Sequence, residues 1–196
     1  MTFTVAAPVP GSAPDYPGTA GEFDVIALKD GDRVVGDVQL ASEDQDLVFI
    51  SSDAQLLRFA AAAVRPQGRS AAGMAGLRLA ARARVIWFGA VPAGGPVVAT
   101  VAGTAGALPG TGAATVKVTP YREYPAKGRA TGGVRCHRFL KGEDALVLAW
   151  AGAAPARGST EAGVPVELPP ADGRRDGSGS RVRQPLTALG GLAPPA

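Results

Sequence analysis

The sequence predicts an all-β, propeller-like fold of about three to four blades of antiparallel strands, and two observations support this prediction. Short apolar or β-branched runs recur along the chain and are separated by Gly, Pro and Asp, as between the strands of a sheet. An internal repeat of about 50 to 60 residues accompanies them, which is the size of one four-stranded blade. Because such a unit cannot bury both of its faces alone, neighbouring blades must stack to complete the core.

The runs differ in how clearly they predict strands. Those around Val85 and Trp150 are apolar on both faces, which is typical of buried strands. Ser52–Val64 has high helix propensity, with Ser or Asp available as a cap, but the repeat favours a strand over Gln55–Phe59. The other expected strands are Asp24–Leu28, Arg33–Val38, Leu47–Ile50, Val85–Phe88, Val97–Val101, Thr115–Val118, Ala145–Ala151 and Val164–Leu168, with Gly89–Gly95 and Gly103–Gly112 as loops between strands.

The repeat is clearest in two segments. Gly68–Met74 and Gly128–Val134 align without a gap at an offset of 60 residues, and each holds an Arg followed four residues later by a Gly. The same offset places Arg78 on Arg138. A partial copy lies upstream at an offset of 52, with Gly21 on Gly73 and Pro17 in place of the Arg, and a weak copy at Arg175–Gly179 keeps the Arg and the Gly.

Charge is distributed unevenly along the chain, although the formal net charge is only +3. Residues 1–53 hold ten acids and two bases, which gives −8, and residues 54–142 hold thirteen bases and one acid, which gives +12. Residues 143–196 hold five bases and six acids, which gives −1. The middle segment is therefore a candidate polyanion-binding surface, while the alternative is that Arg serves as a generic solubilising charge.

Each well-defined copy places an Arg beside glycines in a short loop between expected strands. Glycine permits positive φ and the close approach of a phosphate, and successive exposed N–H groups form anion-binding nests. The alternative is that these glycines only make tight turns and the Arg is solvated. Because the loop is repeated within the +12 segment, anion binding is the favoured interpretation.

Two stretches resemble a known family. Asp46–Phe59 followed by Val64–Met74, and Tyr121–Val134 as the same element in the next blade, are similar to blades of the C-terminal β-pinwheel of bacterial type IIA topoisomerase A subunits, those of DNA gyrase and topoisomerase IV. The similarity covers roughly residues 22–183. The Gln-Arg-Arg-Gly-Gly-Lys-Gly type of box found in gyrase has no close match, so the resemblance favours a topoisomerase IV-like or degenerate wheel.

The resemblance implies a cytoplasmic, nucleoid-associated bacterial domain that binds and bends duplex DNA without reading its sequence. The partners would be double-stranded DNA, the cleavage core of the A subunit, and the ATPase B subunit, with no membrane. Phosphate contacts carry no direct sequence information, and neutralising ~6 phosphates gives a salt slope of about −5. On this basis Arg69 and Arg129 contact phosphates, Gly68, Gly73, Gly128, Gly132 and Gly133 shape the loops, and Arg65, Arg78, Arg122, Lys127, Arg135 and Arg138 supply supporting charge.

The sequence offers little for catalysis or metal binding, so no cofactor is expected and the chain is not predicted to be an enzyme on its own. One Cys and one His exclude a disulfide framework and the commonest metal clusters. Cys136 and His137 are adjacent, and we expect a packed Cys beside a surface His rather than a dyad. Trp87 and Trp150 are expected in the core.

We expect three regions: a flexible or degraded first-blade segment at residues 1–21, a DNA-binding β-pinwheel at 22–183, and a disordered tail at 184–196. No apolar run approaches the length of a membrane span. The alternative function is a propeller-type scaffold whose basic face binds an acidic protein partner.

Overall fold

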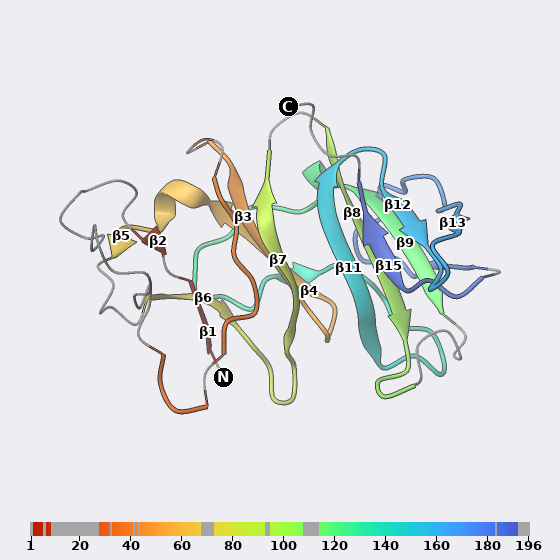
Figure 1. Ribbon diagram of the computed structural model, residues 1–196, viewed down its shortest axis with the longest axis horizontal. Helices are drawn as coiled ribbons and strands as arrows, with labels where there is room; N and C mark the ends of the chain where they lie inside the picture. The colour runs from red at the N-terminus through yellow and green to blue at the C-terminus, as the bar shows by residue number, and fades with distance from the viewer. Residues whose placement is uncertain are drawn as a thin grey trace.

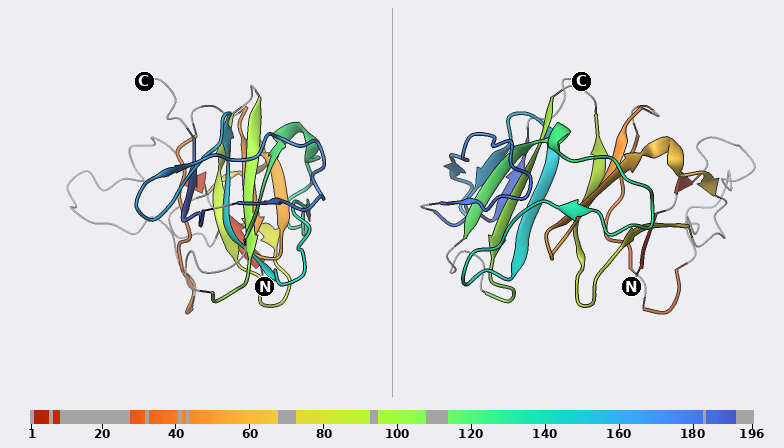
Figure 2. Two further views of the ribbon diagram at one scale, coloured as in Figure 1. Left: turned by 90° about the vertical axis from the view of Figure 1, so that its right-hand side faces the viewer. Right: turned by 180° about the vertical axis from the view of Figure 1, so that it is seen from behind.

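The computed structural model describes residues 2–5, 7–8, 28–31, 33–40, 42, 44–67, 73–92, 95–107, 114–182 and 184–191. Two four-stranded antiparallel sheets lie side by side and dominate the molecule, so the predicted all-β fold is confirmed (Figures 1 and 2). The first blade contains β3 (Asp46–Ser51), β4 (Gln55–Ala60), β7 (Val85–Val91) and β10 (Val134–Arg135). The second contains β8 (Pro96–Gly103), β9 (Thr115–Pro120), β11 (Ala145–Ala153) and β14 (Ser180–Arg181).

Each complete blade takes its outer strand from the repeat that follows it in the sequence. The first blade has the order β10-β4-β3-β7. In the sequence β10 comes after β8 and β9 of the second blade, but it pairs with β4 of the first blade. The second has the equivalent order β14-β9-β8-β11, and β14 reaches β9 from further along the chain. This strand exchange links neighbouring blades by backbone hydrogen bonds in addition to side-chain packing.

Smaller sheets flank the two complete blades. At one end β12 (Arg157–Ser159) pairs with β13 (Pro165–Val166) and β15 (Ala188–Gly190). At the other, β1 (Thr2–Val5) pairs with β6 (Met74–Arg78), and β2 (Ala7–Pro8) pairs in parallel with β5 (Pro66–Gln67). These partial blades agree with the expected three to four blades. β15 belongs to a sheet although it lies within the segment expected to be a tail.

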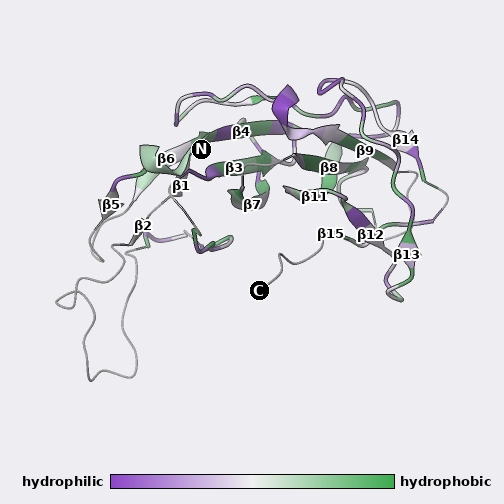
Figure 3. Ribbon diagram, turned by 90° about the horizontal axis from the view of Figure 1, so that it is seen from above, coloured by the Kyte–Doolittle hydropathy of each residue, from purple (hydrophilic) through white to green (hydrophobic). Residues whose placement is uncertain are grey.

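Both faces of the central strands are buried, as their continuous apolar runs predict. One face of β3 contributes Val48 and Ile50 to a core shared with Val98 and Leu146 of the second blade. The other face contributes Phe49, whose ring lies 4.8 Å from that of Phe88, to a second core that also contains Leu77 of β6 (Met74–Arg78). Figure 3 shows hydrophobic stretches along β3, β4, β8 and β9. The two blades are therefore joined through a common core, which β7 and β11 also share.

Most strand predictions are confirmed, and two expectations are corrected. Arg33–Val38 is exposed and forms no strand, and the described residues provide no neighbouring strand to pair with it. Gly89–Gly95 is not wholly a loop, because β7 continues to Val91 before the chain turns. The helical tendency of Ser52–Val64 is limited to the 3-10 turn η1 (Ala61–Ala63), while β4 forms as expected because its apolar residues complete the core. Asp24–Ala27 lie outside the described residues.

The tryptophans are packed as predicted, and glycines make room for them. Trp87 packs against the core shared by the blades, and Trp150 packs on the second blade's other face. A Cβ on Gly89 would lie 2.7 Å from the Trp87 ring, and one on Gly152 would lie 2.5 Å from the Trp150 ring. Because successive residues on one face of a strand are two apart, each ring lies flat over the glycine that follows it.

Candidate nucleic-acid interface

The predicted site residues occupy different environments. Gly68 and Arg69 lie outside the described residues, so their loop is not part of the site described below. Gly73 is half-buried and has a φ of +76°, a backbone conformation that favours glycine. Arg129 is also half-buried. The remaining predicted cations are all exposed: Arg65, Arg78, Arg122, Lys127, Arg135 and Arg138.

The repeated arginine contacts the preceding repeat. The Nη1 of Arg129 donates a hydrogen bond to the carbonyl oxygen of Ala75 at 3.0 Å. Nη1 of Arg175 donates to the carbonyl oxygen of Arg135, which is 60 residues after Ala75, at 3.3 Å. The weak copy recognised at Arg175 is therefore structurally equivalent to the clear one, and its arginine joins one repeat to the next. This contact occupies one nitrogen of a guanidinium that carries five N–H donors.

Backbone hydrogen bonds repeat at the same positions. The Arg78 N–H donates to the carbonyl oxygen of Thr131 at 3.0 Å, and the Arg138 N–H donates to that of Gly177, also at 3.0 Å. The loops that contain Arg129 and Arg175 are thus held against the segments at Arg78 and Arg138. The exposed side chains of Arg78 and Arg138 start from backbone positions that are rigidly defined.

The glycine that ends each loop is required by close backbone packing. Gly133 has a φ of +77°, and a Cβ there would lie 2.4 Å from the Leu56 carbonyl oxygen. A Cβ on Gly179 would lie 2.8 Å from the carbonyl oxygen of Val116, the residue equivalent to Leu56. These glycines allow the exchanged strand to reach its partner strand, which is a structural role. Gly128 has no atom near its missing Cβ, and that of Gly132 would touch only the Arg78 carbonyl oxygen at 3.8 Å.

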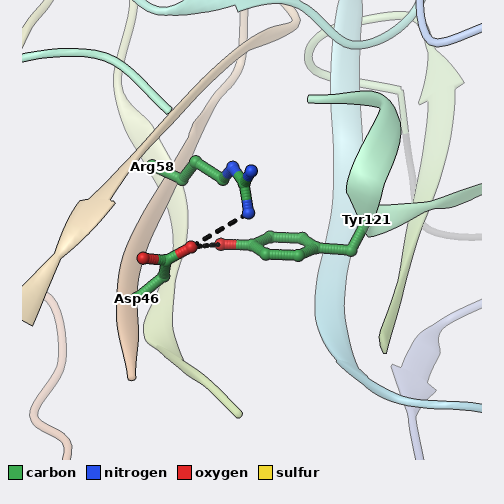
Figure 4. A network of polar contacts seen from close by, with 3 residues as sticks. All are labelled: Asp46, Arg58 and Tyr121. Carbon is green, nitrogen blue, oxygen red and sulfur yellow. Dashed lines mark hydrogen bonds and ion pairs between the residues drawn. The ribbon is translucent and has the colours of Figure 1, made fainter. Parts of the chain in front are cut away.

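A polar cluster joins the two complete blades beside this interface (Figure 4). Asp46 on β3 accepts hydrogen bonds from the Tyr121 hydroxyl at 2.9 Å and from Nη1 of Arg58 at 3.0 Å. The Arg58 guanidinium also lies 4.5 Å from the centre of the Tyr121 ring, within the range of a cation–π contact. Burial raises the pKa of the Tyr121 hydroxyl well above its ordinary value. The cluster borders a hollow of about 630 Å³ between the blades, which Arg122 also lines.

His137 is buried, so the expectation of a surface histidine is wrong. The Gly179 N–H donates to Nε2 at 3.1 Å, which leaves the proton on Nδ1 to be donated to the Thr100 hydroxyl at 2.9 Å. Thr115 lies 3.3 Å from Nε2 and donates its own hydroxyl proton to Glu143. Burial lowers the pKa of His137 to about 4, so the ring is neutral and serves to hold β14 in place.

Lys117 is buried within β9 and is not available to a ligand. Its ammonium donates to the carbonyl oxygens of Arg174, at 3.0 Å, and Arg175. Burial lowers its pKa to about 8. Cys136 is buried as expected, and its burial raises the pKa of the thiol. Sequence reasoning did not assign a role to Lys117, although a lysine between valines in an apolar strand is a signal of a buried, carbonyl-bound cation.

Other kinds of site are not found in the part of the chain that the structure describes. No group of three or more His, Cys, Asp or Glu side chains there could hold a metal ion. The described helices are far too short to cross a bilayer.

An array of antiparallel blades that exchange their outer strands defines the class of β-pinwheel, or propeller-type, repeat domains. Residues 45–92 and 110–148 match the family model described as "DNA gyrase C-terminal domain, beta-propeller". Over these residues the chain resembles the DNA gyrase C-terminal β-propeller domain, and the resemblance inferred from the sequence is confirmed.

Curated relatives are similar to more than half of the chain. The DNA gyrase A subunit of Mycobacterium bovis is 36% identical over 118 residues, 59% of this chain and 13% of the relative. The DNA gyrase A subunit of Escherichia coli is 34% identical over 116 residues, 59% of this chain and 12% of the relative. Topoisomerase subunit TopoM of Mycolicibacterium smegmatis is 34% identical over 110 residues, 55% of this chain and 14% of the relative. The chain thus spans only about an eighth of these relatives.

Solved structures share the fold. The E. coli ParC C-terminal domain superposes with a TM-score of 0.60 and 17% identity, covering 85% of this chain and 67% of that one. The C-terminal domain of DNA topoisomerase IV gives a TM-score of 0.58 and 16% identity, covering 78% of this chain and 51% of that one. At these identities the matches establish the fold alone, and the chain resembles an accessory domain of a type IIA topoisomerase.

Proposed function

We propose that this chain is a sequence-independent duplex-DNA-binding and DNA-bending wheel that acts within a type IIA topoisomerase. The change in DNA topology would be carried out by a separate cleavage core of the A subunit, together with the ATPase B subunit. The chain would act in the bacterial cytoplasm, at the nucleoid. It would bind DNA without catalysing a reaction, since its role is to hold a bent duplex near the core.

The observation that carries this proposal is the exposure of the bases in the +12 segment. Of its thirteen bases, Arg58 is paired with Asp46, Lys117 is buried and Arg129 is half-buried, and Arg69 lies outside the described residues. The other nine are exposed: Arg65, Arg78, Arg82, Arg84, Arg122, Lys127, Arg135, Arg138 and Lys141. Seven of these nine are arginines, and an exposed guanidinium group is suited to bidentate contacts with phosphate.

The repeat supports phosphate contacts at regular intervals. Arg78 and Arg138 occupy equivalent positions one repeat apart, and their backbone N–H groups are anchored by equivalent hydrogen bonds. We propose that both contact phosphates, and that Arg129 does so through the guanidinium nitrogens not bound to Ala75. Glu123 is the single acid in the +12 segment, and it pairs with Arg122 at 3.4 Å.

Fluorescence anisotropy with a labelled 60-bp duplex tests the proposal. Binding through ~6 phosphates predicts that log K falls with log salt at a slope of about −5, equally for duplexes of unrelated sequence. The Arg69→Ala/Arg129→Ala double variant should reduce the slope by ~2. Arg157→Ala removes an exposed arginine outside the +12 segment and serves as the matched control, with an unchanged slope.

Bending has its own measurement. Donor and acceptor dyes at the two ends of the duplex should move closer when the chain binds. Absence of binding at 50 mM salt would refute the DNA-binding proposal. Binding that favours an acidic protein over DNA would instead support the scaffold alternative.

A further inference from the structure

The turn between β6 and β7 has an unusual backbone. The Ala83 N–H donates to the Ala80 carbonyl oxygen at 3.2 Å and closes the turn, as the equivalent Glu143–Leu140 bond of 3.0 Å does one repeat later. Gly142 occupies the left-handed position of the later turn, with a φ of +94°. The residue 60 positions earlier is Arg82, with a φ of +64°. A β-substituted residue is disfavoured there, and turns of this kind usually have glycine.

The other non-glycine residues of positive φ are alanines whose backbone groups hold neighbouring segments. The Ala54 carbonyl oxygen accepts from the Cys136 N–H at 2.9 Å, and the Ala130 N–H donates to the Gly76 carbonyl oxygen at 2.6 Å. Arg82 is exposed, and within the described part of the chain no hydrogen bond or ion pair engages it. Among the described residues no contact compensates the strain at Arg82, and its exposed guanidinium faces solvent, where a partner outside the chain can bind it.

The two equivalent turns also differ in charge. The turn at 140–144 carries Glu143, which accepts from the Leu140 N–H at 2.7 Å, and Asp144, which accepts from the Ala105 N–H at 2.6 Å. The turn at 80–84 contains no acid, and its two arginines, Arg82 and Arg84, are both exposed. The first blade therefore presents two cations where the second presents one cation and two acids.

Resting on the proposed DNA-binding function, we propose that the turn Ala80–Arg84 is a phosphate-contact site for the DNA backbone. Arg82 is its principal contact, and Arg84 supports it from a backbone position fixed by hydrogen bonds with Ser52. The equivalent turn of the second blade does not take part, because its carboxylates repel phosphate. DNA is thereby held at this end of the first blade and not at the same end of the second.

Arg82→Gly tests the site, because it removes the charge and relieves the strain together. With the full chain and the 60-bp duplex, the salt slope should fall by ~0.9, which is about a 3.5-fold smaller loss of affinity between 50 and 200 mM salt. The Tm should rise by about 2–4 °C. Arg82→Lys should keep both the slope and the Tm of the parent. Arg157→Ala removes one exposed arginine outside the +12 segment and should leave the slope unchanged.

The outcomes separate this site from the function on which it rests. If the parent binds DNA and Arg82→Gly has the parent's slope, the site is wrong while the DNA-binding function stands. An equal loss for Arg157→Ala also overturns the site, because the effect would then be one of overall charge. If the parent itself does not bind at 50 mM salt, both proposals fail. A lower slope with a higher Tm for Arg82→Gly alone supports the site.

Discussion

Gly133 allows β10 to cross from the second repeat to the first blade, and replacing it tests how much stability this strand exchange contributes. In Gly133→Ala, the new Cβ would lie 2.4 Å from the carbonyl oxygen of Leu56 and 2.7 Å from its carbonyl carbon. Both are backbone atoms of β4, a central strand of the first blade. Because β4 is held on its other side by β3, relief must come from displacement of β10.

The expected cost has two parts. Holding alanine at a φ of +77° costs about 1 kcal/mol. Displacing β10 weakens its pairing at Val134–Leu56 and Arg135–Gln55, where each lost hydrogen bond contributes about 1 kcal/mol. We therefore expect the free energy of unfolding to fall by about 2–4 kcal/mol in Gly133→Ala.

Two further glycines in the same repeat separate these contributions. Gly142 has a φ of +94° and open space around its missing Cβ, so Gly142→Ala should show only the backbone cost of about 1 kcal/mol. Gly128 has open space and no positive φ, so Gly128→Ala should change stability by less than about 0.5 kcal/mol.

Urea unfolding followed by tryptophan fluorescence measures all three variants. With an m-value of about 2 kcal/mol/M, Gly133→Ala should lower the urea midpoint by roughly 1–2 M. Gly142→Ala should lower it less, and Gly128→Ala least. If Gly133→Ala is no less stable than Gly142→Ala, the close approach to Leu56 does not constrain the exchanged strand, and the reasoning is refuted.

Three other predictions concern the polar contacts between and within blades. Tyr121→Phe removes the hydrogen bond to Asp46 and should lower the free energy of unfolding by about 1–2 kcal/mol in the same urea assay; an unchanged midpoint would show that the cluster does not tie the blades together. Burial lowers the pKa of His137 from 6.5 to about 4, so as the pH falls the unfolded chain takes up the proton before the folded chain does. The free energy of unfolding should therefore decrease by roughly 3 kcal/mol as the pH falls from 6.5 to 4. Urea midpoints across this range should be less pH-dependent in His137→Gln, and an identical pH profile would contradict the burial of a neutral ring. Arg129→Lys should be destabilised by about 1 kcal/mol, because it loses the contact with the Ala75 carbonyl oxygen, but it should keep the DNA salt slope. Arg129→Ala should be destabilised and should also show a reduced salt slope. A Lys variant as stable as the parent would argue against the contact.

Much of the fold was predictable because its signals are local. The period of the repeat and the continuous apolar runs indicated blades whose strands are buried on both faces, and β3 and β8 are buried in this way. Gln55–Phe59 was correctly assigned to a strand against its helix propensity, since the repeat reflects tertiary packing as well as local preference. Arg33–Val38 shows the converse, because an apolar run forms a strand only where another strand is present to pair with it.

The candidate site was predictable in its composition but not in its contacts. The charge of the middle segment follows from counting residues. Arg78 and Arg138 are exposed, and their contact with phosphate stays a prediction. Which arginines also form hydrogen bonds within the protein depends on carbonyl oxygens that are distant in sequence. The 54 residues between Arg129 and its acceptor Ala75 carry no local signal of that contact.

The sequence by itself determined the all-β class, the repeat, the resemblance to gyrase C-terminal domains and the concentration of cations between residues 54 and 142. These properties depend on side-chain periodicity and composition, which are written locally in the chain. Only the tertiary structure decided that outer strands are exchanged between blades, that His137 and Lys117 are buried, and that Arg82 occupies a position suited to glycine. Each of these depends on which distant backbone groups meet, and that is set by how neighbouring blades pack.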